Sequence, residues 1–163
     1  MDRVLERVEI LRRGLERVLE YIVTFLLAAL VVVVVLGVVY RKAGASLVWY
    51  DEVASIMLAW LTYYGAALAA LKRAHIGFPG LVDALKPPLK LVVLVLAEVC
   101  VLTFFVLLAW MGWVVLLVLA GDTLVSLPSV SVQFTQSVIP IGACLFVVAQ
   151  LLSLPTVWKE CRP

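Results

Sequence analysis

The feature that most limits what this chain can fold into is an uncharged run at residues 21–40, YIVTFLLAALVVVVVLGVVY. A helix of that length spans about 30 Å, which matches the hydrocarbon core of a bilayer. The whole composition agrees, because 65% of the residues are hydrophobic and 15% are charged, whereas soluble globular domains average about 45–50% and about 25%. The sequence therefore indicates an integral membrane protein.

Three further apolar stretches follow the first, separated by breaks rich in Gly, Pro and charged residues. We expect spans at about 21–40, 53–71, 89–120 and 132–154, all within a single membrane domain, 1–163. The third stretch would be about 48 Å long as a helix, so it must tilt, extend past the membrane or begin in the interface. The expected fold class is all-α integral membrane, with four transmembrane helices.

The N-terminal segment, residues 1–20, predicts an amphipathic helix that lies in the membrane interface. Its apolar side chains recur at helical spacing, whereas five Arg residues alternate with five acidic residues. Gly14 offers a bend between this arm and the first span. The alternative is a solvated helical extension that merely continues the first span.

The Lys and Arg residues fall unevenly on the segments between the spans. Eleven lie in the N-terminal arm, the 72–90 connection and the C-terminal tail, two in the 41–52 connection and none in 121–131. By the positive-inside rule, both termini and the central connection should be cytoplasmic. The 41–52 and 121–131 connections should then lie outside.

Residues that could support catalysis or hold a cofactor are scarce. The chain has one His, His75, and neither a Cys–His cluster nor a Gly-rich phosphate loop followed by Lys. We therefore expect no enzyme, cofactor, metal site or nucleic-acid partner. Glu98 lies deep in an apolar run, where a carboxylate at the bilayer centre would cost about 2.5–3.5 kcal/mol. It is either an ion-coupling or buried pairing group, or it lies at the interface or against a neighbouring chain.

The second span has two faces of different character. Small side chains at three- and four-residue steps allow close helix approach on one face: Ser55, Ala59, Thr62, Ala66 and Ala69 or Ala70. Trp60, Tyr63 and Tyr64 cluster on another face, where a phenolic hydroxyl at mid-span needs a protein partner. A closed four-helix bundle could satisfy these groups internally, but four such helices hide only part of the surface, which favours a larger partner.

Short motifs around the second span occur in a distinctive order. W-Y-D-E precedes it, AWLTYYGAAL lies within it, and LKRAHIGFPGLVDAL follows it. This order resembles the small membrane subunit of TRAP transporters, the tripartite ATP-independent periplasmic importers, of the DctQ-like type. That family has an aromatic residue and two acids before the span, a Trp and a Gly within it, and a His and an Asp after it. The matching positions are Trp49, Asp51, Glu52, Trp60, Gly65, His75 and Asp83.

The C-terminal half resembles the same family at four more positions: Gly121 and Thr123 in the 121–131 connection, and Pro140 and Gly142 at the start of the last span. Two departures stand out. The acidic pair is Asp-Glu where Glu-Glu is commoner, and Ser129 and Gln133 stand where aromatic residues are frequent. These departures affect the expected contacts on the outer side.

The resemblance implies a non-catalytic subunit of a sodium-coupled importer in the cytoplasmic (inner) membrane of a bacterium or archaeon. In such systems a periplasmic substrate-binding protein delivers an organic acid to a large many-span subunit, which the small subunit braces as a scaffold. The expected partners are therefore that large subunit, the binding protein and the lipid bilayer. The candidate docking residues are Trp49, Asp51, Glu52, Trp60, Tyr63, Tyr64, Gly65, His75, Asp83, Pro140 and Gly142.

Two other functions stay open at this point. One is an autonomous small ion-coupled transporter that acts as a homo-oligomer, with Glu98 as its proton site. The other is a haem-binding membrane anchor for a redox enzyme. For the acidic pair, we predict that it fixes the start of the second span and helps to dock it, with Glu52 more buried than Asp51. Its ionic partner would be Arg41 or Lys42 of the same connection, or a basic residue of the large subunit.

Overall fold

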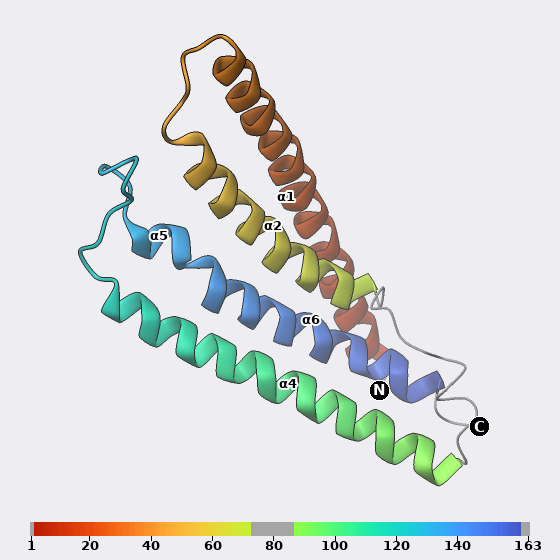
Figure 1. The fold of residues 1–163 in the computed structure, drawn as a ribbon. Helices are drawn as coiled ribbons and strands as arrows, with labels where there is room; N and C mark the ends of the chain where they lie inside the picture. Colours follow the sequence, from red (N-terminus) through yellow and green to blue (C-terminus); the bar gives the residue numbers. More distant parts are fainter. Residues whose placement is uncertain (1, 73–86, 161–163) are drawn as a thin grey trace.

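The computed structural model describes residues 2–72 and 87–160, and nearly all of this part is helical (Figure 1). The helices are α1 (Asp2–Lys42), α2 (Tyr50–Lys72), α4 (Pro87–Val118), α5 (Val132–Gln136) and α6 (Val138–Glu160). Four segments of the described part are long and apolar enough to cross a membrane, with the last one covering α5 and most of α6. The predicted class, an all-α membrane protein with four spans, is confirmed.

The predicted bend at Gly14 is wrong, and α1 agrees with the alternative that the N-terminal segment continues the first span as one helix. α1 is one helix of 41 residues, about 61 Å long, and it passes through Gly14 without a break. Nothing lies within 4 Å of the position of a Cβ at Gly14, so no neighbour forces a bend there. A glycine inside a helix costs only about 1 kcal/mol relative to alanine, which is too little to interrupt a helix of this length.

The last predicted span is divided into two helices near Ser137. The side chain of Ser131 caps α5 by accepting a hydrogen bond from the backbone N–H of Gln133, at 3.2 Å. The break after α5 places Pro140 in the first turn of α6, where a backbone N–H would have no partner within the helix. The proline is therefore accommodated without loss of an α6 hydrogen bond.

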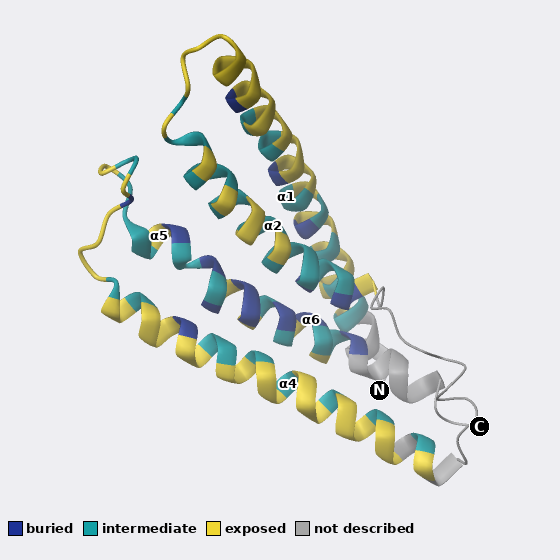
Figure 2. Ribbon diagram, viewed as in Figure 1, coloured by how far each residue is buried: buried dark blue, intermediate teal, exposed yellow. Residues whose placement is uncertain are grey.

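The helices form an open layer in the order α1, α2, α6, α4 (Figure 1). α6 inserts between α2 and α4, so the spatial order differs from the chain order. Because the layer does not close into a bundle, its members are buried unequally (Figure 2). In the most apolar stretch of the last span 39% of residues are buried, whereas in that of α4 none is.

The most tightly packed part of the layer is a core cluster shared by α1, α2 and α6: Leu19, Ala67, Ala70, Leu71, Phe146 and Ala149. Three of its six members are alanines, which let the helix backbones approach closely. Phe105 of α4 joins it by stacking on Phe146, with ring centroids 3.6 Å apart. This cluster makes the four long helices one packed unit.

Candidate docking site around the second span

The two adjacent acids at the start of α2 point to different surroundings. Asp51 is exposed, whereas Glu52 is half-buried, as predicted. The carboxylate of Glu52 accepts hydrogen bonds from the backbone N–H of Ser126 at 2.9 Å, from the Ser126 hydroxyl and from the backbone N–H of Val125 at 3.3 Å. Its partners thus belong to the α4–α5 loop, residues 119–131.

This geometry corrects one of the predicted pairings of Glu52. Arg41 and Lys42 are exposed at the end of α1, and the partners of Glu52 are backbone and hydroxyl donors instead of a cation. A carboxylate can accept several hydrogen bonds at once, and those made to a charged acceptor are stronger than neutral ones. Glu52 therefore ties the start of α2 to the α4–α5 loop inside this chain.

Trp60 joins the middle of α2 to α5. Its indole N–H donates to the backbone carbonyl of Thr135 at 2.9 Å, and its ring contacts those of Phe134 and Tyr64 at centroid distances of 5.4 and 6.2 Å. The carbonyl of Thr135 lies beside the α5–α6 break, where a hydrogen bond within the helix is missing. Trp60 is therefore an internal contact between helices, and Tyr64 packs beside it.

Two glycines allow α6 to approach its neighbours closely. A Cβ on Gly142 would lie 2.6 Å from the Cβ of Tyr63. A Cβ on Gly112 of α4 would lie 3.0 Å from Cδ of Pro140. Both distances are shorter than an ordinary van der Waals contact, so only glycine fits these backbones as they stand. We predicted Tyr63, Pro140 and Gly142 to dock a partner, but Tyr63 packs against Gly142 and Pro140 packs against Gly112, all within the chain.

The two aromatic residues at the start of α2, Trp49 and Tyr50, also contact the chain itself. Tyr50 packs its ring against Gly37 of α1, where a Cβ would lie 2.8 Å from Cε2 of the ring. Trp49 is half-buried, and its carbonyl accepts the backbone N–H of Val53 at 3.1 Å. In the sequence, this contact is indicated only by Gly37, because it is a small residue within a run of Val and Leu.

The α4–α5 loop is folded into a compact turn. Gly121 has a φ of +96°, which residues other than glycine rarely adopt, and Thr123 forms an antiparallel bridge with Ser131. Gln133, one of the departures from the family pattern, donates its side-chain amide to the carbonyl of Leu116 at 2.8 Å. The start of α5 is thus held to the end of α4 by a polar contact at this position.

Glu98 forms a polar contact between α4 and α6. Its Oε2 accepts a hydrogen bond from the side-chain amide of Gln150 at 2.8 Å. Its other oxygen, Oε1, is buried without a hydrogen-bond partner. The interpretation of Glu98 as a buried pairing group therefore has a specific partner, and that partner lies within the chain.

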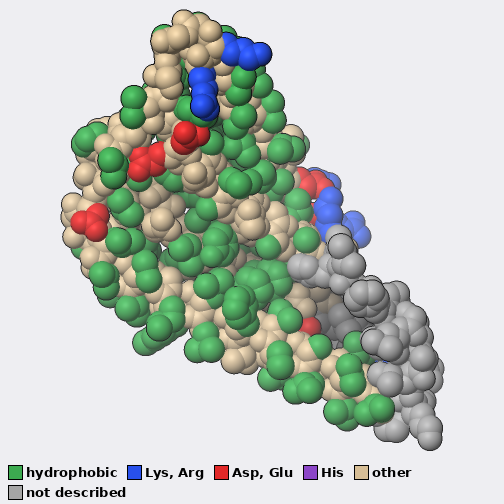
Figure 3. Space-filling model, in the orientation of Figure 1, with side chains coloured by type: hydrophobic (Ala, Val, Ile, Leu, Met, Phe, Trp, Pro, Cys, Tyr) green, Lys and Arg blue, Asp and Glu red, His purple; other side chains and the backbone are tan. Residues whose placement is uncertain are grey.

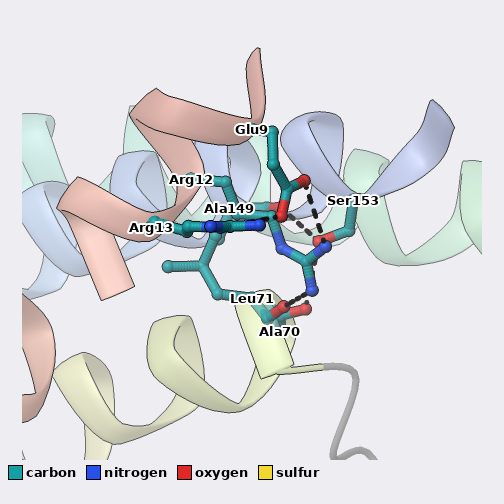
Figure 4. A network of polar contacts seen from close by, with 7 residues as sticks. All are labelled: Glu9, Arg12, Arg13, Ala70, Leu71, Ala149 and Ser153. Atoms are coloured by element: carbon teal, nitrogen blue, oxygen red, sulfur yellow. Dashed lines mark hydrogen bonds and ion pairs between the residues drawn. The ribbon is translucent and has the colours of Figure 1, made fainter. Parts of the chain in front are cut away.

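A polar junction, which the sequence did not reveal, joins α1, α2 and α6 beside the core cluster (Figure 4). The guanidinium of Arg12 donates to the carbonyl of Leu71 at 2.8 Å. The hydroxyl of Ser153 in α6 lies 2.9 Å from the carbonyl of Ala149 in its own helix and 3.3 Å from the carbonyl of Ala70 in α2. The carbonyls of Ala70 and Leu71 lie in the last turn of α2, where backbone acceptors lack helical partners. Lys72 pairs with Glu20 and, at 3.9 Å, with Glu16.

One face of α2 remains turned away from the rest of the chain. Asp51, Ser55, Leu58, Ala59 and Thr62 are exposed, and nothing lies within 4 Å of a Cβ position at Gly65. Residues three or four apart share a helix face, so these six form one surface, which we call the outward face of α2. The predicted His75 and Asp83 lie outside the described residues.

Hydrophobic side chains cover most of the molecular face shown in Figure 3, and charged side chains lie mainly toward its margins. Among the described residues, no group of three or more His, Cys, Asp or Glu side chains is arranged to hold a metal ion. The described residues form helix-packing surfaces, and Glu52, Trp60 and Glu98 make their hydrogen bonds inside the chain.

A comparison with known protein families identifies the family of this chain. The family described as "Tripartite ATP-independent periplasmic transporters, DctQ component" matches residues 30–160. The chain belongs to the DctQ family. The match covers α2, α4, α5 and α6 and the last part of α1, which are the elements described above. A search of curated proteins returned no match.

Membership in the DctQ family makes the chain a small-subunit component of a TRAP transporter and confirms the resemblance seen in its motifs. It also agrees with the four apolar helices, which make the chain a multi-pass membrane protein. Several motif residues of this DctQ subunit, including Glu52, Trp60 and Gly142, contribute to its own packing.

Proposed function

We propose that this chain is the non-catalytic small subunit of a sodium-coupled importer of organic acids, and that it braces the large transport subunit as part of its scaffold. The observation that carries the proposal is the DctQ family match over residues 30–160. The partners would be the large many-span subunit and a periplasmic substrate-binding protein. Substrate and sodium sites would then lie on the large subunit.

The open layer of helices supports a bracing role. A closed bundle would hide its own polar and small side chains, but this layer leaves both of its faces uncovered, and α4 in particular (Figure 2). The internal contacts made by Glu52, Trp60 and Glu98 hold the helices in fixed positions relative to one another. A rigid, uncovered layer can widen the static part of a larger membrane protein.

The outward face of α2 is the surface that we propose for docking the large subunit. Its small residues permit close helix approach, which drives helix association in membranes. Its two hydroxyls are already satisfied, because Ser55 donates to the carbonyl of Asp51 at 2.6 Å and Thr62 to that of Leu58 at 2.8 Å. This face can therefore enter an apolar interface without leaving a donor unpaired.

We also propose that the chain lies in the cytoplasmic membrane of a bacterium or archaeon with both termini in the cytoplasm. The distribution of Lys and Arg supports this orientation. The acidic pair and the α4–α5 loop would then face the periplasm, on the side from which the binding protein approaches. Asp51 would be the exposed charge at the edge of the docking face.

The decisive experiment is extraction in a mild detergent followed by identification of the chain that co-purifies. Gly65→Leu should abolish recovery of the large subunit, because it places a large side chain in the middle of the docking face. Ala28→Leu is the matched control, since Ala28 is exposed on α1. Recovery of the unmodified chain alone, as a monomer or homo-oligomer, would contradict the proposal. Unchanged recovery with Gly65→Leu would move the docking surface elsewhere.

Glu98 supports a second candidate function, an autonomous ion-coupled transporter acting as a homo-oligomer. The observation in its favour is the buried, unpartnered Oε1. Reconstitution of the purified chain in liposomes separates the two functions. Transport by this chain alone that is lost with Glu98→Gln would favour the second candidate, whereas an inert chain would favour the scaffold subunit.

A further inference from the structure

The N-terminal half of α1 carries an exposed apolar stripe. Ile10, Leu11, Val18, Tyr21 and Phe25 are exposed, with values from 54% for Val18 to 77% for Tyr21. Their spacing of one to seven residues places them on one side of the helix, opposite Leu19, which is buried in the core cluster. Past Gly14, which lies on the same side of the helix, the stripe continues from the N-terminal arm into the apolar run of the first span.

The acidic side chains that the structure describes in this segment are all paired. Glu16 and Glu20 pair with Lys72 of α2, and Glu9 pairs on its own helix with Arg12 at 3.9 Å and with Arg13 at 3.3 Å. Figure 4 shows Arg12 turned toward the end of α2. Arg7 and Arg17 are exposed and three residues or fewer from members of the stripe. Among the side chains that the structure describes, the surface around the stripe is therefore apolar and positively charged.

The length of α1 limits where this stripe can lie. If Tyr21 and Tyr40 mark the two boundaries of the hydrocarbon core, an upright helix would carry Ile10 about 16 Å beyond that core. The headgroup region is only about 5–8 Å thick on each side, so exposed apolar side chains would stand in water. With Tyr40 kept at its boundary, a tilt of roughly 35–40°, near the upper end of the observed range, shortens the rise from Tyr40 to Ile10 from about 45 Å to about 34–37 Å and brings Ile10 into the headgroup region.

We propose that this surface, the exposed stripe with Arg7 and Arg17, binds anionic phospholipid headgroups and so sets the tilt of α1. Apolar side chains beside arginines are the chemistry of an interfacial helix, in which the long basic side chains reach the phosphates. The stripe is continuous with the membrane-spanning part of α1, which favours lipid over a soluble partner. The inference does not depend on the transport function, because it concerns only this chain and its bilayer.

The test uses the full-length chain reconstituted in vesicles. A fluorophore is attached at Leu11→Cys in a variant whose three native cysteines are replaced by Ser. Quenching by nitroxide-labelled lipid headgroups is compared with quenching by aqueous iodide. Vesicles contain phosphatidylcholine alone or phosphatidylcholine with phosphatidylglycerol. We expect the ratio of lipid to iodide quenching to rise about fivefold or more with phosphatidylglycerol, the preference that one basic residue near an anionic surface provides.

Arg7→Gln with Arg17→Gln should reduce this rise to less than about twofold, and added salt should reduce it by screening. Arg41→Gln with Lys42→Gln removes the same charge from the other end of α1 and should keep the rise. Equal iodide quenching in both kinds of vesicle would overturn the proposal in favour of a solvated helix. Protection from both quenchers in the co-purified complex would also overturn it, because a partner protein would then cover the stripe.

Discussion

Glu52 and Ser126 lie 74 residues apart in the chain, and the carboxylate of the first accepts both the backbone N–H and the hydroxyl of the second. The neighbouring Asp51 is exposed on the outward face of α2. The two acids therefore have separable roles, one within the chain and one at its surface. Single replacements can distinguish these roles, which the shared motif alone does not.

Glu52→Ala should loosen the α4–α5 loop. The change removes the acceptor of the backbone N–H groups of Val125 and Ser126, so these amides should exchange with solvent several-fold faster. Hydrogen-exchange mass spectrometry of the loop peptide measures the effect. Asp51→Asn is the control and should leave this exchange unchanged.

The same two variants should behave differently in the complex. Asp51→Asn should weaken recovery of the large subunit, because it removes the exposed charge at the edge of the docking face, with the loop intact. If neither variant alters recovery, the acidic pair has no docking role, and Glu52 serves only the fold of the loop.

The spans were largely predictable from the sequence because a helix that crosses a bilayer must be apolar over about the thickness of the hydrocarbon core, so the length of a hydrophobic run indicates a span. The start of α4 differs from its prediction by two residues, and the ends of α1 and α2 by two and one. The continuity of α1 through Gly14 was only the alternative prediction, because the sequence does not tell whether a neighbour requires a bend at a glycine. Likewise, Pro140 indicated a helix start without locating the break at Ser137.

The contacts between helices could not be read from periodicity. The spacing in α2 separates two faces, but it does not tell which face meets the chain and which meets a partner. Trp60 and Tyr63 find their partners more than seventy residues away, in α5 and α6. The insertion of α6 between α2 and α4 decides these pairings, and it depends on Gly112 and Gly142, whose small size has meaning only in three dimensions.

Trp60→Phe should destabilise the chain while it retains the aromatic contacts. The variant lacks the N–H that donates to the Thr135 carbonyl at 2.9 Å, a loss of about 0.5–1.5 kcal/mol for a typical hydrogen bond. In a chain of this size, 1 kcal/mol corresponds to roughly 2–4 °C in Tm. A thermal melt in detergent measures the change. Trp110→Phe is the matched control, because Trp110 is 70% exposed; an equal fall in both would contradict the role of the Thr135 contact.

Gly142→Ala and Gly65→Ala should have opposite consequences for the isolated chain. The first places a Cβ 2.6 Å from the Cβ of Tyr63, which no rotamer change can relieve, so α6 and α2 must move apart. Overpacking of this kind costs about 1–3 kcal/mol. The second adds a methyl group to open space and should be tolerated, with a small gain from helix propensity. Denaturation of both variants in the same detergent tests the contrast, and equal stability would place the α2–α6 contact in doubt.

Gln150→Leu should destabilise the contact between α4 and α6 more than a double replacement does. It leaves Oε2 of Glu98 without its donor at 2.8 Å, beside an Oε1 that is already unpartnered. A buried polar group left unsatisfied costs about 1–3 kcal/mol. Glu98→Leu combined with Gln150→Leu removes both polar groups, and its loss should be smaller than that of Gln150→Leu alone. Thermal melts of the two single variants and the double variant complete the cycle. If the stability losses of the two single variants add up to the loss of the double variant, Glu98 and Gln150 are not coupled. That result would favour a transport role for Glu98 over a structural one.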